Sequence, residues 1–351
     1  MIHGASPALV DRAIESGDSL PGGRGFAGRL PDGRSVRDVL GRYPVFTERS
    51  SAGWAFSPAE LEDPVSFPAG HAGDERVWTL PDPPAFVAED EATERVASAL
   101  EASLGIDDDG LAVAFSGGVD SAVVASRLDA PLYVVGFEGS HDLEAARESA
   151  SAMGRELRTI ECTHTDIERA VPIVARATGR ANAMDVGIAL PLFLVAERAV
   201  EDGHDRLAVG QGADELFGGY EKVIRADHRV EADSVRGATR EVIASLPEQL
   251  ERDVLSIRAA GAEPVAPLLD DRVVDAALRL DGPMLATEGE RKRVFRRAAR
   301  GFVPAEIADR EKKAVQYGSL IAREIDRLAR RAGYKRRMDD HVTQYVESLL
   351  E

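Results

Sequence analysis

The chain is poor in cysteine and lysine and contains no long apolar run. Cys162 is its single cysteine, which excludes an intramolecular disulfide, a CxxC redox pair and any multi-cysteine zinc or iron–sulfur site. We therefore expect a reducing compartment, with the cytoplasm as the predicted location. The apolar stretches fall far short of the roughly 20 residues that a spanning helix needs, and residues 1–12 lack a basic flank followed by an apolar core. Neither a membrane span nor a secretory signal is expected.

Acidic residues are in large excess. There are 61 acidic against 43 basic residues, for a net charge of −18, and nearly all of the basic residues are arginines. Such a surface repels the nucleic-acid backbone, so a broad nucleic-acid interface is not expected. The composition fits a halophilic protein, because the screening length of roughly 3 Å at 1 M salt damps self-repulsion. An ordinary acidic cytosolic protein is the alternative.

The composition of the chain changes near residue 84. Residues 1–84 are rich in glycine and proline and have short apolar runs between turn signals, which predicts a small β-rich module. The prolines of Leu80–Pro84 favour an extended connector. Residues 85–351 alternate strand and helix patterns up to about residue 222, and beyond it the pattern is helical only. We predict an α/β fold, a doubly wound parallel sheet with its ligand at the carboxyl ends of the strands, followed by a C-terminal helical part.

The segment Ser116–Ser121, with the sequence SGGVDS, is the strongest functional motif. It follows the apolar run 111–115 and precedes a helical pattern. Glycines let the backbone approach an anion, a helix N-terminus presents free N–H groups, and serine hydroxyls donate to phosphate oxygens. Asp120 lies among these groups, where a carboxylate is suited to hold Mg²⁺ on phosphate oxygens. The spacing is not that of the Walker loop, and neither serine lies in the GxSxG elbow of hydrolases.

These residues resemble the PP-loop ATP pyrophosphatases, which cleave ATP between its α and β phosphates. A second segment, Val209–Tyr220, has the sequence VGQGADELFGGY and is similar to the asparagine synthetase motif GEGADELFGGY. With further matches at residues 134–143, 266–270 and 310–318, the chain resembles the asparagine synthetase family over about residues 86–335. The resemblance implies that ATP and Mg²⁺ activate a small carboxylate as an acyl-adenylate, which is then amidated. Aspartate is the default substrate of that family.

The resemblance also implies the residues of the site. Lys312 is the candidate cation for the leaving pyrophosphate, with Lys313 as the runner-up. The basic helical stretch 288–300 around Lys292 could also face phosphate, but its composition favours a solvated helix face. Asp120 and Asp214 are the predicted metal ligands. The predicted catalytic residues are Lys312, Asp120, Asp214 and Gln211. The predicted nucleotide-binding residues are Phe115, Ser116, Gly117, Gly118, Asp120, Ser121, Val135, Gly210 and Lys312.

Three departures from the family pattern bear on the substrate and on the nitrogen source. Residues 1–84 resemble a shortened glutaminase module, but Ile2 stands where that module has its catalytic cysteine. We therefore expect ammonia to come from solution or from a separate partner protein. Gln211 replaces a glutamate that could act as a base. Ala183–Pro191 lacks the arginine that binds aspartate in the bacterial enzymes, and its Asp185 is a candidate contact for a cationic group on the substrate.

Two other functions stay open on the sequence. One is a tRNA-modifying PP-loop enzyme, against which the single cysteine and the acidic surface count. The other is a noncatalytic, ATP-binding regulatory protein, against which the intact Ser116–Ser121 loop counts. A homodimer is left open as well, and no membrane partner is expected.

Overall fold

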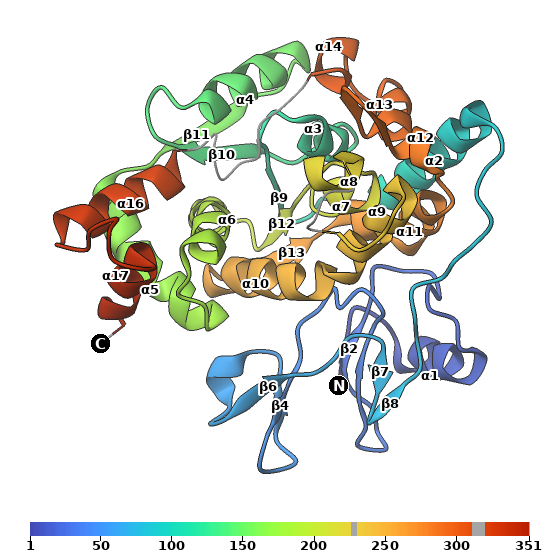
Figure 1. The fold of residues 1–351 in the computed structure, drawn as a ribbon, viewed down its shortest axis with the longest axis horizontal. Helices are drawn as coiled ribbons and strands as arrows, with labels where there is room; N and C mark the ends of the chain where they lie inside the picture. The colour runs from blue at the N-terminus through green and yellow to red at the C-terminus, as the bar shows by residue number, and fades with distance from the viewer. Residues whose placement is uncertain (226–229, 311–319, 351) are drawn as a thin grey trace. The chain divides into compact units, whose positions relative to one another are not determined.

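A computed structural model describes residues 1–225, 230–310 and 320–350 (Figure 1). The chain forms two compact units. Unit 1 comprises residues 1–106, 210–251 and 266–309, and unit 2 comprises residues 107–209, 252–265 and 310–351. The predicted division into residues 1–84 and 85–351 stays a prediction.

Unit 2 is built on a five-stranded parallel sheet. The strands follow the order β11-β10-β9-β12-β13, with the bounds β9 (Leu111–Ala114), β10 (Leu132–Gly136), β11 (Leu157–Glu161), β12 (Arg206–Ala208) and β13 (Glu263–Val265). The central strands β9 and β10 are almost fully buried, as the strands of parallel sheets are when helices cover both faces. Strands that follow β9 along the chain extend the sheet first to one side and then to the other. This is the order of a doubly wound sheet, and the predicted fold class is confirmed.

The chain reverses its direction of winding between β9 and β12. These two strands pair directly, with Ala208 opposite Val113. In doubly wound sheets, ligands bind outside the carboxyl ends of the strands at this switch point. The segment that begins at Phe115 leaves β9 at this edge.

The helices of unit 2 pack on the faces of this sheet or against the helices that do. They are α3 (Val119–Ala125), α4 (His141–Ala152), α5 (His164–Thr178), α6 (Ala183–Glu201), α16 (Ile321–Arg331) and α17 (His341–Ser348). Helices α4 and α6 both contact β10, and Figure 1 shows them on opposite sides of that strand. Helices α16 and α17 pack beside α5. Helix α10 (Leu246–Ala259) begins in unit 1 and ends in unit 2.

Unit 1 contains three small antiparallel sheets. One has the order β1-β2-β3-β7-β8, one the order β5-β4-β6, and one consists of β14 and β15. Their strands are β1 (Ile2–His3), β2 (Ala27–Arg29), β3 (Ser35–Arg37), β4 (Phe46–Glu48), β5 (Trp54–Ala55), β6 (Pro64–Ser66), β7 (His71–Ala72), β8 (Glu75–Arg76), β14 (Ala286–Thr287) and β15 (Glu290–Arg291).

The helices of unit 1 are mostly short. They are α1 (Pro7–Ser16), α2 (Glu89–Leu104), α7 (Ala213–Leu216), α8 (Glu221–Arg225), α9 (Val235–Ala244), α11 (Asp271–Leu278), α12 (Gly282–Leu285), α13 (Arg293–Ala299) and α14 (Ala305–Ala308), with single 3-10 turns η1 (Pro58–Glu60) and η2 (Pro267–Leu269). The longest, α2, packs against α11 and α13. Residues 1–84 have an apolar core of their own, in which Phe26 and Trp78 meet edge to face.

Two expectations about the elements differ from the structure. The prediction that strands end near residue 222 is wrong, because β13 adds a fifth strand to the sheet. β13 has three residues, one of which is Pro264. An edge strand this short is too brief to show the alternation of apolar and polar residues that predicts a strand. Helix α6 was also not predicted, since its apolar residues surround the whole helix and Pro191 lies inside it.

Candidate active site

The loop after β9 forms a compact turn at the carboxyl edge of the sheet. Phe115 is buried, and its backbone N–H donates to the carbonyl of Tyr133 on β10 over 2.7 Å. The Ser121 hydroxyl lies 3.2 Å from the Ser116 hydroxyl and accepts from the Ser116 backbone N–H over 3.2 Å. These bonds close the loop on itself, so that its backbone is ordered before any anion arrives.

Gly117 is required by the geometry of this loop. Its φ of 72° is left-handed, and a Cβ there would lie 2.5 Å from the carbonyl oxygen of Ala145 on α4. The Gly117 carbonyl accepts from the Ser149 hydroxyl over 2.8 Å. Arg310 donates to both Ala145 and Ser149 over 3.3 Å, so it braces the same turn of α4. Ser149 is a supporting residue that the sequence did not identify, and Arg310 is the first residue of the matched segment 310–318.

Replacing Gly117 with alanine is expected to lower the free energy of unfolding by about 2 kcal/mol and to abolish Mg·ATP binding. The left-handed backbone alone costs roughly 1–2 kcal/mol for a residue with a Cβ, and the contact with Ala145 adds to that cost. Urea unfolding and equilibrium dialysis measure the two effects. Gly139→Ala is the matched control, because Gly139 has a φ of 69° but nothing within 4 Å of a Cβ. Equal losses in both variants would contradict the requirement for glycine in the loop.

The predicted residues of unit 2 are gathered around the start of α3. Gly118 is the N-cap of this helix, and Asp120 lies in its first turn with a half-buried side chain. Val135 is buried on the neighbouring strand β10. The structure therefore brings the predicted phosphate-binding residues of this unit together in one loop and one helix N-terminus.

The second motif follows β12 and belongs to unit 1. Gly210 and Gln211 are half-buried, and Gly212 caps α7, the one-turn helix that carries Asp214. The side chain of Asp214 is 47% exposed, whereas that of its neighbour Glu215 is buried. Asp214 is thus the carboxylate of this motif that solvent and ligands can reach.

Lys292 forms an ion pair with this motif that was not expected from the sequence. It is only 6% exposed, so the solvated helix face expected for it is wrong. Its Nζ lies 2.7 Å from the Oδ1 of Asp214, and its backbone is left-handed with a φ of 55°. A Cβ on Gly219 would meet both the carboxylate of Asp214 and the Cε of Lys292, so the glycine lets the pair close. A strained backbone at a residue with a Cβ is often found where function requires it.

Glu215 lies behind this pair. It accepts a hydrogen bond from the hydroxyl of Tyr220. Burial, and then the charge of Asp214, raise the pKa of Glu215 above its ordinary value, while Lys292 opposes the shift. The motif therefore has one accessible carboxylate, Asp214, which is held by Lys292, and one buried carboxyl group, Glu215.

The carboxylates of the site fit a Mg²⁺ ion that takes most of its ligands from phosphate oxygens and water. Among residues 1–225, 230–310 and 320–350 no three His, Cys, Asp or Glu side chains are grouped to hold a metal by themselves. Mg²⁺ is commonly held by one or two carboxylates, phosphate oxygens and water, and Asp120 or Asp214 can supply the carboxylate. Lys312 and Lys313 lie outside the described residues, and their roles stay predictions.

Asp185 is bonded to side chains of its own unit. It accepts from Arg252 over 2.9 Å and from the Asn182 side chain over 2.7 Å, and Arg180 lies 3.6 Å away. Burial opposes ionisation, but these bonds hold the pKa of Asp185 below its ordinary value. The hypothesis that Asp185 contacts a cationic group of the substrate is therefore disfavoured, because arginines of the same unit already neutralise it.

Cys162 has no nucleophilic character. It is buried at the end of β11, and burial raises the pKa of its thiol to about 12, with a smaller contribution from Asp166. A thiol with this pKa is protonated at neutral pH. It is therefore unsuited to attack glutamine or to carry sulfur.

Fold and site together define an α/β protein with a glycine-rich loop at the switch point of its doubly wound sheet. The chain matches the protein-family model described as asparagine synthase over residues 91–241 and 226–348. This match covers most of the chain, and the chain belongs to the asparagine synthase family. No helix in the described part of the chain is long and apolar enough to span a membrane.

Individual proteins are similar to parts of the chain. The chain is 31% identical over 304 residues to a proposed glutamine-hydrolyzing asparagine synthetase of Methanocaldococcus jannaschii, which covers 74% of this chain and 55% of that protein. It is 26% identical over 188 residues to asparagine synthetase B, glutamine-hydrolyzing, of Escherichia coli, covering 53% of this chain and 34% of that protein. The chain thus spans about half the length of these relatives or less. Among solved structures, NMN synthetase from Francisella tularensis gives a TM-score of 0.33 at 14% identity, over 76% of this chain and 94% of that one.

Proposed function

We propose that the chain catalyses ATP-dependent, AMP-forming amidation of a small carboxylate, with asparagine formation from aspartate as the default reaction. Membership of the asparagine synthase family supports this reaction type. The observation that carries the proposal is the closed Ser116–Ser121 loop, which lies at the switch point where doubly wound sheets bind ligands. A cytoplasmic location and a homodimer stay predictions.

The proposed reaction proceeds in two balanced steps. A carboxylate oxygen of the substrate bonds to the α-phosphorus of ATP, and the bond from that phosphorus to the bridging oxygen breaks to release pyrophosphate. Ammonia then attacks the acyl carbon, gives up one proton to solvent or a base, and displaces AMP as the amide forms. Most of the catalysis is positioning and stabilisation of charge on the phosphates, because the protein forms no covalent bond.

The proposal gives each site residue a separate task. The N–H groups at the start of α3 and the hydroxyls of Ser116 and Ser121 donate to phosphate oxygens. Asp120 and Asp214 are the proposed ligands of Mg²⁺, which would neutralise charge on pyrophosphate. Lys292 orients the carboxylate of Asp214. Lys312 is the proposed cation for the leaving group.

The proposed nitrogen source rests on the state of Cys162. This thiol is buried, with a pKa raised to about 12. We propose free ammonia, or ammonia delivered by a separate protein, as the nucleophile. The same thiol also counts against the tRNA-modifying alternative that carries sulfur on cysteine.

Pyrophosphate release from Mg·ATP in molar KCl, with aspartate and ammonium omitted in turn, tests the proposed function. Release that requires aspartate and yields asparagine and AMP supports the default reaction. Release with another carboxylate keeps the reaction type and changes the substrate. Binding of ATP without release under any condition would favour the noncatalytic alternative.

Changing Gln211 to glutamate is expected to raise the ammonia-dependent rate with aspartate about 10-fold, because a general base contributes typically 10²–10⁴-fold and another group serves in part here. An amide cannot accept the proton at physiological pH, whereas a carboxylate can. The rate as a function of pH measures the gain. Gln249→Glu on α10 is the control, since Gln249 lies outside the motif and bonds Ser245. An unchanged rate would show that Gln211 does not limit amide formation.

A further inference from the structure

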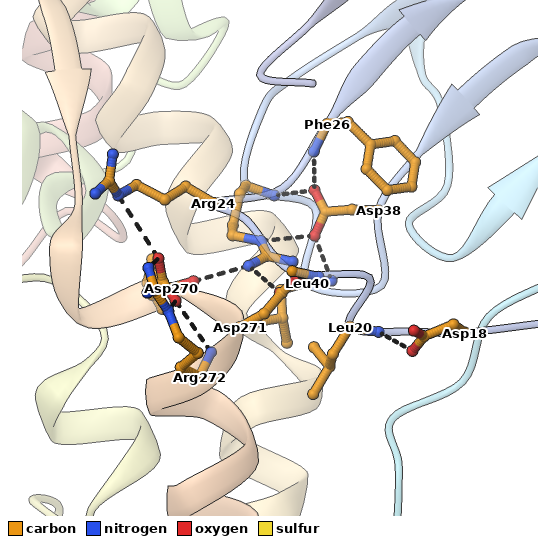
Figure 2. A network of polar contacts seen from close by, with 12 residues as sticks. Asp18, Leu20, Arg24, Phe26, Asp38, Leu40, Asp270, Asp271 and Arg272 are labelled. Atoms are coloured by element: carbon orange, nitrogen blue, oxygen red, sulfur yellow. Dashed lines mark hydrogen bonds and ion pairs between the residues drawn. The ribbon is translucent and has the colours of Figure 1, made fainter. Parts of the chain in front are cut away.

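Arg42 bonds the β-rich module of residues 1–84 to another segment of unit 1, and two of its partners, Asp38 and Asp271, are labelled in Figure 2. One η nitrogen of this arginine donates to the carbonyl of Leu269 over 2.8 Å and to Oδ1 of Asp271 over 2.7 Å. Its Nε donates to Asp38 over 2.9 Å. Asp271 in turn accepts from the backbone N–H of Gly22 over 2.9 Å.

This network is buried. The side chains of Arg42, Asp38 and Asp271 are 3%, 0% and 4% exposed. Asp38 is itself fixed by the backbone N–H groups of Phe26, Leu40 and Arg42. The donors of a guanidinium group lie in one plane and point in fixed directions. Buried carboxylates on two sides of the group therefore fix its orientation. Arg42 therefore fixes the position of the turn at 269–271.

Leu269 extends this contact to the second motif. Its side chain fills the space beside the Cα of Gly212, where a Cβ would collide with the Cδ2 of Leu269. Leu269 is 1% exposed, and Gly212 caps α7, which begins one residue before Asp214. Arg42, Leu269 and Gly212 thus form a continuous series of contacts within unit 1 that ends at the accessible carboxylate.

We propose that Arg42 is a positioning residue for the ATP site, and that residues 1–84 are retained as a brace for the Gln211–Asp214 segment. The inference rests on the proposed function, because it assigns that segment to the nucleotide and its metal. It gives a task to a module that lacks a nucleophile. A rigid outer contact keeps a ligand carboxylate oriented, and its loss lowers affinity without any change in the ligand itself.

The test compares Arg42→Met and Leu269→Ala with two matched controls. Arg49→Met removes an arginine of the same module whose partner, Asp63, is exposed. Leu268→Ala removes an equally buried leucine next to Leu269, whereas the atoms nearest to a Cβ on Gly212 belong to Leu269 and Leu216. The probe is the Mg²⁺ complex of α,β-methylene-ATP, which cannot be cleaved at the α–β position. Its dissociation constant is measured by calorimetry, and thermal unfolding is recorded for every variant.

The brace predicts that Arg42→Met and Leu269→Ala each weaken analogue binding ~10-fold at temperatures where the variants are folded. The double variant should bind no more weakly than the weaker single one, because both changes interrupt the same contacts. Leu268→Ala should lose stability and keep its affinity. Wild-type affinity in both test variants, with only a lower melting temperature, would overturn the inference.

Failure of folding does not leave the inference untested. If Arg42→Met does not fold, the difference between Leu269→Ala and Leu268→Ala decides it, since both remove the same atoms from the same buried turn. If the unmodified chain does not bind the analogue at all, the proposed function falls and this inference falls with it. Binding by the unmodified chain with equal affinity in all variants overturns the inference alone.

Discussion

Lys292→Met is expected to slow pyrophosphate release from Mg·ATP by ~10²-fold, the usual cost of losing one preorganised charged contact. Without its ammonium group the carboxylate of Asp214, now held at 2.7 Å, can turn away from the ligand. The same change should leave the melting temperature within ~3 °C of the unmodified protein. Methionine fills a similar buried volume, and Asp214 is 47% exposed, so water can solvate the carboxylate that loses its partner.

The combination of a large rate loss with a small stability loss distinguishes a functional lysine from a structural one. Lys335→Met is the control, because Lys335 is exposed and its ammonium group donates to the carbonyl of Arg330. Steady-state pyrophosphate release and thermal unfolding are measured on the same preparations. A variant at Lys292 that unfolds readily but keeps its rate when folded would show that the lysine is structural.

Asp120→Asn is expected to reduce pyrophosphate release by ~10³-fold, at the upper end of what removal of a single charge-stabilising group costs. Asparagine has the size of aspartate and keeps the first turn of α3, but it lacks the charge that a Mg²⁺ ligand needs. The remaining rate should therefore depend more steeply on Mg²⁺ concentration. Initial rates over a range of Mg²⁺ concentrations at saturating ATP measure this dependence.

Asp129→Asn provides the matched control for Asp120. Asp129 is exposed beyond the end of the same helix, so the substitution removes an equal charge without touching the loop. An Asp120→Asn variant with the wild-type dependence on Mg²⁺ would contradict the assignment of Asp120 as a metal ligand. An equal rate loss in both variants would show a general effect of charge.

The sheet and its loop could be predicted because their signals are local. Apolar runs such as 111–115 and 132–137 are continuous, and SGGVDS follows the first of them directly. The structure has β9, β10 and the loop where these patterns place them. Gly117 could be assigned to the loop from the sequence, although its close contact with Ala145 could not.

The Lys292–Asp214 pair could not be predicted, because its partners are far apart in sequence. A lysine in a basic helical stretch is usually expected on a solvated helix face. The left-handed backbone at residue 292 is also not visible in the sequence, because the residue is not a glycine. The pair of Asp185 and Arg252 could not be predicted for the same reason, since Arg252 lies on α10 and is distant from Asp185 in sequence. Local patterns identify elements and loops, whereas buried ion pairs depend on how distant segments meet.

Transfer of ¹⁸O from the substrate to AMP tests the proposed reaction most directly. Aspartate with its side-chain carboxylate labelled is incubated with Mg·ATP and ammonium, and the AMP is examined by mass spectrometry. Attack of the carboxylate on the α-phosphorus predicts AMP that carries one labelled oxygen, together with unlabelled pyrophosphate. Unlabelled AMP, or ADP and phosphate in its place, would contradict activation of aspartate through an acyl-adenylate.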